Sequence, residues 1–248
     1  MNKTAIIIPS RLDALRLPNK PLKLINNKEM ILHVYEAAKK TNTGEVYVAT
    51  PDQKIIDIII SNGGKAVLTS LNHQTGTDRI YEVFKTKLKS EPNVIVNLQG
   101  DMPNIDPQAI TDLVSYMHKD QCDIGTLASS FSSESELIDE NNVKVAVKDK
   151  LVTNIFQKAT DFFRTGVKNY KNFYHHVGIY AFTNKALVRY VSLERSKLEL
   201  KRKLEQLRAL ENNMSINVGF ISSSPLSVDT KNDLIEIKKL MENNNEQD

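Results

Sequence analysis

Three positively charged side chains follow a short apolar run near the start of the chain. The run, Ala5–Ile8, has the length and isoleucine content of a buried parallel strand, and Arg11, Arg16 and Lys20 come soon after it. A loop at the carboxyl end of such a strand lies over the crevice where open α/β sheets bind ligands. Arg gives a planar fork for phosphate oxygens and Lys a compact point charge, so the segment favours a polyphosphate site. The alternative is a solvated basic loop.

A carboxylate follows a second predicted strand. Val94–Leu98 is apolar, and Gln99 and Asp101 come directly after it. A carboxylate in this position suits Mg²⁺, which prefers oxygen ligands, although Gly-Asp and Asp-x-Pro are also common turn sequences. Asp229 is a possible second acid beside Asp101, unless it or Thr230 simply caps the last helix. Two acids on a cation that also touches phosphates would form a phosphoryl- or nucleotidyl-transfer site.

The segment His73–Arg79 reads His-Gln-Thr-Gly-Thr-Asp-Arg. Helix capping by Thr77 or Asp78 explains about half of it. The other residues offer hydrogen-bond donors and acceptors suited to a base edge or a ribose: Gln74, Thr75, Gly76 and Arg79.

Two adjacent histidines, His175 and His176, lie on a predicted strand. Neighbouring side chains on a strand point to opposite faces, so the two rings do not readily share one metal ion. His176 shares a face with Gly178 and Tyr180, either as part of a binding site or as a structural histidine with satisfied hydrogen bonds.

Composition limits the class of protein. The 248 residues suffice for one large α/β domain or two small ones, and a net charge of +3 spread along the chain argues against nucleic acid as the main partner. Cys122 is the only cysteine, which excludes an intrachain disulfide and a cysteine metal cluster. The first apolar run is too short for a signal peptide, and no run approaches membrane-spanning length. We therefore expect a soluble, cytoplasmic protein with no membrane partner.

Strands and helices alternate in the first half of the sequence. Strands are predicted over Ala5–Ile8, Val46–Ala49, Ala66–Leu68 and Val94–Leu98, and helices over Met30–Lys40, Lys54–Ser61, Arg79–Leu88 and Pro107–His118. This alternation implies right-handed βαβ units and a mostly parallel sheet flanked by helices.

The rhythm changes after Asp123. Strands are predicted over Ile124–Ala128, Val143–Val147, Val177–Phe182 and Ile216–Ile221, and helices over Leu198–Glu211 and Lys231–Met241. The fold class that follows is α/β, with a Rossmann-like, mostly parallel sheet and a smaller mixed α+β subdomain.

An ordered set of motifs runs from Ile6 to Leu234. It comprises IIIPSR with RLP.KPL, VAT at Val48–Thr50, HQTGTDR, VNLQGD, VKV at Val143–Val145, HVGIY, LEQLR at Leu204–Arg208, and SVDT. In this order the motifs resemble the 3-deoxy-manno-octulosonate (Kdo) cytidylyltransferases, also called CMP-Kdo synthetases. Each motif alone is weak, but the ordered set is specific.

The resemblance implies a single domain over residues 1–248 with a fold of the nucleotide-sugar transferase type. Residues 1–128 would form a nucleotide-binding half, and residues 129–248 a half that binds the sugar and dimerises. The implied reaction joins CTP and Kdo, an acidic 2-keto sugar, to give CMP-Kdo and pyrophosphate for lipopolysaccharide synthesis. A homodimer and Mg²⁺ as cofactor are implied as well.

The resemblance also assigns roles to single residues. Lys20, Asp101 and Asp229 are the implied catalytic residues, with Mg²⁺ on the two aspartates. The implied CTP site comprises Arg11, Arg16, Lys20, Thr75, Gly76, Arg79 and Gln99. The implied sugar contacts are Gln99, His176, Tyr180, Glu205 and Gln206.

Two stretches depart from the family pattern. The family usually has Phe-Ser-Arg followed by Ile-Pro. In this chain Phe156 is followed by the loop Gln157–Phe162, which has Lys158 at the arginine position and lacks the proline. Lys158 is the predicted partner of the sugar carboxylate, as a point charge rather than a fork. Arg202 stands where many members have Glu. A cytidylyltransferase for a related acidic sugar and a weakly active nucleotide-binding paralogue therefore remain as alternatives.

Overall fold

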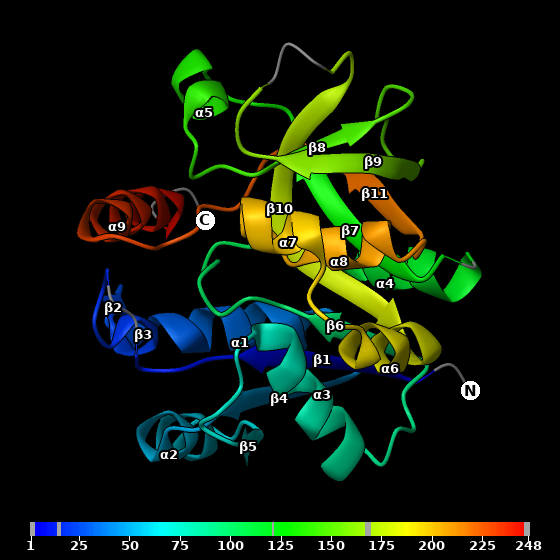
Figure 1. Ribbon diagram of the computed structural model, residues 1–248. Helices are drawn as coiled ribbons and strands as arrows, with labels where there is room; N and C mark the ends of the chain where they lie inside the picture. The colour runs from blue at the N-terminus through cyan, green and yellow to red at the C-terminus, as the bar shows by residue number, and fades with distance from the viewer. Residues whose placement is uncertain (1–2, 14–15, 121, 167–169, 246–248) are drawn as a thin grey trace.

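The computed structural model describes residues 3–13, 16–120, 122–166 and 170–245 (Figure 1). The strands of its main sheet are β1 (Thr4–Pro9), β4 (Glu45–Thr50), β5 (Ala66–Leu68), β6 (Val94–Asn97), β7 (Ile124–Ser129), β8 (Lys144–Val147), β9 (Gln157–Phe163), β10 (Phe173–Thr183) and β11 (Ile216–Phe220). Within these residues the strands form one sheet in the order β5-β4-β1-β6-β10-β7-β11-β9-β8, and β8 also pairs with β10. A short hairpin, β2 (Leu24–Ile25) with β3 (Lys28–Glu29), stands apart from it.

Helices cover both faces of the sheet. They are α1 (Met30–Lys40), α2 (Gln53–Ser61), α3 (Gly76–Thr86), α4 (Pro107–Lys119), α5 (Glu134–Ile138), α6 (Asn184–Ser192), α7 (Lys197–Arg202), α8 (Gln206–Glu211) and α9 (Lys231–Asn245), with a 3₁₀ helix η1 (Lys20–Leu22). In β1, Ile6 and Ile8 pack into the core beneath α1 and α4, and Ile7 into the core beneath α3 and α6. Burial on both faces explains the unbroken apolar run. None of the described helices is long and apolar enough to span a membrane.

The predicted parallel sheet of the first half is confirmed. β1 pairs in parallel with β4 and with β6, and β4 pairs in parallel with β5. The chain builds outward from β1 to β4 and β5, and then returns to the other side of β1 with β6. The strand order therefore reverses between β1 and β6, which is where α/β sheets of this kind bind ligands.

The second half is mixed, as the predicted subdomain implied. β10 is antiparallel to β6, β7 and β8, whereas β7 and β11 are parallel. Because β10 pairs with β6, one sheet continues through both halves (Figure 1). The division into a nucleotide-binding and a sugar-binding half stays a prediction.

The predicted single helix over Leu198–Glu211 is wrong. α7 ends at Arg202, Lys203 adopts a left-handed conformation with φ of 55°, and α8 begins at Gln206. The break lets the Arg208 guanidinium form a buried, two-pronged pair with Glu199 at 2.7 and 2.8 Å. On one straight helix these residues would stand roughly 13 Å apart along the axis.

Besides η1, β2 and β3, the elements β9, α5 and α6 were not predicted. The Gln157–Phe162 stretch is strand β9 rather than a loop, and the short helix α5 and the longer α6 follow Ser133 and Thr183, which cap them. The strand β10 begins at Phe173, four residues before the predicted start.

Candidate functional site

A cavity of about 710 Å³ opens at the carboxyl ends of β1 and β6, where the strand order reverses. The loop after β1, the segment before α3 and the residues after β6 line it. It brings together nine of the predicted site residues: Arg11, Arg16, Lys20, Thr75, Gly76, Arg79, Gln99, Asp101 and Asp229. Its size lies in the range typical of small-molecule sites.

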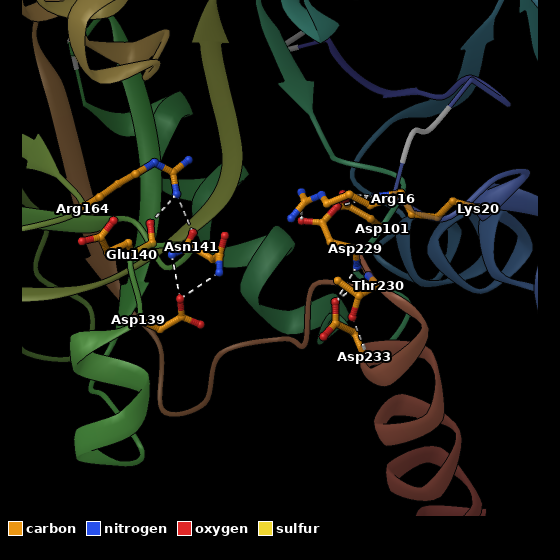
Figure 2. Close-up of polar contacts among 10 residues, drawn as sticks. All are labelled: Arg16, Lys20, Asp101, Asp139, Glu140, Asn141, Arg164, Asp229, Thr230 and Asp233. Atoms are coloured by element: carbon orange, nitrogen blue, oxygen red, sulfur yellow. Dashed lines mark hydrogen bonds and ion pairs between the residues drawn. The ribbon is translucent and has the colours of Figure 1, made fainter.

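Lys20 lies at the centre of the polar contacts in this cavity. Its Nζ donates to Asp101 Oδ2 at 2.9 Å and to Asp229 Oδ1 at 3.0 Å, and Arg16 Nη2 lies 2.9 Å from Asp229 Oδ2 (Figure 2). Three segments that are far apart in the sequence thus meet on one ammonium group. The two carboxylates predicted to bind a metal ion both contact the Lys20 ammonium group.

Backbone contacts fix the position of Asp229. The Val228 amide donates to the Asp101 carbonyl at 2.9 Å, which ties the segment before α9 to the end of β6. Thr230 Oγ1 accepts from the Asp233 amide, and the Asp233 carboxylate accepts from the amides of Asp229 and Thr230 at 2.8 and 2.7 Å (Figure 2). Thr230 is therefore the capping residue, and the Asp229 side chain faces the cavity.

The charges at this site stabilise one another. Burial lowers the pKa of Lys20, but the Asp101 and Asp229 carboxylates outweigh it, and the net pKa of Lys20 is raised. Burial raises the pKa of Asp229, but the attraction of Lys20 and Arg16 outweighs it, and the net pKa lies below its ordinary value. Both groups are therefore charged at neutral pH.

The loop after β1 is held from both ends. The Leu12 amide donates to Asp52 Oδ2 at 2.8 Å, and the Asn19 amide donates to the Leu12 carbonyl at 3.2 Å. Closing the loop in this way presents Arg11 and Arg16 at the mouth of the cavity, where both side chains are exposed.

The segment before α3 forms another wall. Thr75 caps α3 by accepting from the Asp78 amide at 3.1 Å, so the positive end of the helix dipole faces the cavity. A Cβ on Gly76 would lie only 3.2 Å from Pro9 Cγ, so the glycine permits a close approach to β1. Arg79 lines the cavity but is buried, and its Nη1 donates to Thr69 Oγ1 at 2.5 Å and to the Ser70 carbonyl at 3.0 Å. Arg79 thus also holds Thr69 and Ser70, which precede the His73–Arg79 segment.

The predicted sugar contacts lie beside this cavity on the α3 and α8 side of the sheet. Tyr180, Glu205 and Gln206 line a small hollow together with Thr77. The His176 ring lies 5.3 Å from the Tyr180 ring, centroid to centroid, and its Nε2 is 2.9 Å from Thr126 Oγ1. Burial lowers the pKa of His176 to about 3, so the ring is neutral.

Lys158 does not join this group. On β9 it pairs with Asn217, whose side chain donates to Tyr116 Oη on α4 at 2.6 Å. Directly paired residues share a face of the sheet, so Lys158 lies on the α4 side, opposite the face of Tyr180 and Glu205. The prediction that Lys158 meets the sugar carboxylate is not supported by its position.

A chain of polar side chains links the two groups of residues; its middle members, Asn97 and Thr77, are buried and its ends are half-buried. Gln99 donates to Asn97 at 2.9 Å, Asn97 donates to Thr77 at 3.3 Å, and Thr77 donates to Glu205 at 3.3 Å. The sequence interpretation did not assign a role to Asn97. Its signal was a single polar residue at the end of the apolar strand Val94–Asn97.

The chain is similar to known cytidylyltransferases in both sequence and fold. A family model described as cytidylyltransferase matches residues 5–216. A relative from Bartonella bacilliformis named 3-deoxy-manno-octulosonate cytidylyltransferase is 38% identical over 245 residues, covering 96% of this chain and 98% of the relative. A relative of the same name from Rhodopseudomonas palustris (strain BisB5) is 41% identical over 237 residues, 93% of this chain and 94% of the relative.

The chain belongs to the 3-deoxy-manno-octulosonate cytidylyltransferase family. A solved structure titled CMP:2-keto-3-deoxy-manno-octonic acid synthetase complexed with CTP superposes with a TM-score of 0.88, at 34% identity, covering 98% of this chain and 99% of the other. A 4-diphosphocytidyl-2C-methyl-D-erythritol synthase from Anaerococcus prevotii, at 12% identity and a TM-score of 0.64, shares the fold alone.

The ion pairs of Asp229 predict how stability changes with pH. Since the pKa of Asp229 is lowered on folding, its charge stabilises the folded protein above an unfolded pKa of about 3.9, and this contribution is lost as the pH falls through the lower folded value. Asp229→Asn should lower the free energy of unfolding at neutral pH by about 1 kcal/mol or less, because the pair is partly exposed. The difference in unfolding free energy between the two proteins should become smaller below about pH 4. Urea denaturation of both proteins across this range measures it, and a difference independent of pH would contradict the ion-pair explanation.

Proposed function

We propose that this chain transfers a cytidylyl group from CTP to the anomeric hydroxyl of Kdo and releases pyrophosphate. The sugar oxygen would attack the α-phosphorus, and the bond from the α-phosphorus to the oxygen of the β-phosphate would break. The observation that carries the proposal is the cavity at the end of β1 and β6, where cationic side chains surround a pair of carboxylates. The family membership and the CTP-bound relative support it.

The cations of the β1 loop would bind the triphosphate. Arg11 and Arg16 are exposed at the cavity mouth, and Lys20 lies deeper, with 16% of its side chain exposed. Fixed positive charges beside the phosphates would stabilise the charge that moves onto the leaving pyrophosphate. No covalent bond to the protein is needed, because positioning and charge carry most of such a transfer.

The residues present fit a magnesium site. Asp101 and Asp229 offer hard oxygen ligands that already converge on one cation. Among the described residues no group of three or more His, Cys, Asp and Glu side chains is placed to hold a metal ion, so phosphate and water would complete the coordination. When bound, Mg²⁺ would neutralise phosphate charge and polarise the reacting oxygens.

The sugar would lie between Gln99 and the residues on β10 and α8. Tyr180, Glu205 and Gln206 offer donors and acceptors to its hydroxyls, and neutral His176 adds a further polar edge. Burial raises the pKa of the Glu205 carboxyl within this group. A related acidic sugar is the second candidate acceptor, since the position of Lys158 leaves the partner of the sugar carboxylate unassigned.

A role in lipopolysaccharide synthesis and a cytoplasmic location form part of the same proposal. Both rest on the family.

A pyrophosphate-release assay tests the function. Purified protein with Mg²⁺ should release pyrophosphate with CTP and Kdo. It should release far less with ATP or GTP, because polar groups left unpaired by the wrong base disfavour binding of that nucleotide.

Asp101→Ala and Asp229→Ala should each lower kcat at least about 100-fold, since several kcal/mol of charge stabilisation are lost. Asp112→Ala, on α4 and outside the cavity, is the matched control. Turnover only with another sugar acid would replace the acceptor, and full activity of both variants would overturn the metal assignment.

Arg202 is predicted to position the sugar-side residues. Arg202 lies three residues before Glu205. Its Nη1 donates to both carboxylate oxygens of Asp161 on β9, at 2.7 and 2.9 Å. Arg202→Ala should free the α7–α8 turn and raise the KM for the sugar about three- to tenfold, with the KM for CTP nearly unchanged. Asp161→Asn should act similarly, and the double variant should add little. Exposed Lys201→Ala is the control, and an equal rise in the KM for CTP would contradict the prediction.

A homodimer is also proposed, on the ground of the family. The apolar residues Val177, Phe182, Leu204 and Leu207 are buried within the single chain, so they give no separate argument for a dimer. Light scattering at low micromolar concentration should give twice the mass of one chain. A single-chain mass would contradict the proposal.

A further inference from the structure

The inference concerns the space between Asp101 and Asp229, and it rests on the proposed function because it takes the two carboxylates as the metal ligands. We propose that Lys20 occupies the metal position in the free enzyme and competes with the divalent cation until the nucleotide binds. Lys20 would thus hold the metal site closed in the absence of CTP.

The contacts in the cavity carry this proposal. Lys20 Nζ engages Asp101 Oδ2 and Asp229 Oδ1, and Arg16 engages Asp229 Oδ2, so three of the four carboxylate oxygens are already paired (Figure 2). A Mg²⁺ ion needs such oxygens at about 2.0–2.1 Å. An ammonium group at 2.9 and 3.0 Å from the same oxygens would then lie too close to a second cation.

Lys20 is the stronger competitor of the two basic residues. Its side chain is 16% exposed, against 58% for Arg16, and exposed ion pairs contribute little to binding because water and salt screen them. Lys20 also contacts both carboxylates, whereas Arg16 contacts only Asp229.

The nucleotide supplies the reason for Lys20 to move. Four cationic side chains and three carboxylates line the cavity, so a triphosphate without a metal would face the acids as well as the bases. The flexible lysine stem lets the ammonium move to the phosphates, and the exposed carboxylate oxygens then accept the cation that the phosphates also bind. Nucleotide and metal should therefore each raise the affinity of the protein for the other.

Mn²⁺ binding to the free protein tests this. Water proton relaxation enhancement separates protein-bound Mn²⁺ from free and CTP-bound Mn²⁺, and needs neither sugar nor turnover. The unaltered protein should show enhancement only when CTP is present. Lys20→Met should bind Mn²⁺ without CTP at least about tenfold more tightly than the unaltered protein, because a positive charge beside both ligands has been removed. Lys20→Arg, which keeps the charge, should stay weak.

Two controls make the result specific. Lys23→Met removes one charge from the same stretch, at a residue outside the cavity lining, and should change Mn²⁺ binding by less than about twofold. Lys20→Met with Asp101→Asn should lose the gain. Circular dichroism checks folding, and Lys20→Gln replaces Lys20→Met if that variant is unfolded.

The proposal is overturned if Lys20→Met binds Mn²⁺ no better than the unaltered protein, or if the gain survives Asp101→Asn. It is also overturned if the unaltered free protein binds Mn²⁺ as tightly as its CTP complex. Failure of the proposed function has a different signature, namely no pyrophosphate release with CTP and Kdo whatever the Mn²⁺ result.

Discussion

One ammonium group joins the parts of the molecule on which the site depends. Lys20 begins η1 after the β1 loop, Asp101 follows β6, and Asp229 precedes α9. The Lys20 ammonium group lies 2.9 Å from the Asp101 carboxylate and 3.0 Å from the Asp229 carboxylate. Like charges on Asp101 and Asp229 would repel without a cation between them. The backbone contact from Val228 to Asp101 brings the two carboxylates together, and the positive charge of Lys20 offsets their repulsion. The cavity can therefore be shaped before any ligand arrives.

The sheet then determines how the rest of the site is arranged. β10 pairs antiparallel with β6, and this pairing places Tyr180 directly beside Asn97. The residue that ends the nucleotide-side strand thus neighbours a residue of the sugar side. The polar chain from Gln99 through the buried Asn97 and Thr77 to Glu205 crosses the same junction. Because unpaired polar groups are costly when buried, each member constrains the rotamer of the next. The two subsites are consequently positioned by one set of contacts.

The sequence was sufficient where local pattern and chemistry coincide. The strand ends that carry Arg11 and Asp101 could be located because apolar runs buried on both faces stop abruptly at polar residues. The sequence was insufficient where contacts between residues far apart in the chain determine the local structure. The break at Lys203 depends on a buried Glu199–Arg208 pair, which has no local pattern. The side on which Lys158 lies depends on its register with Asn217, and this could not be assigned without recognising β9 as a strand.

The two stretches that depart from the family pattern contact each other in the fold. Asp161 belongs to the β9 stretch that lacks the usual proline, and Arg202 stands at a position where many members have Glu. In the fold the two side chains form one ion pair, and Arg202 also donates to the Phe162 carbonyl at 2.9 Å. An acid at position 202 would instead face the Asp161 carboxylate, and like charges at this distance are unfavourable. Arg202 and Asp161 therefore hold α7 against β9, beside the turn that precedes Glu205.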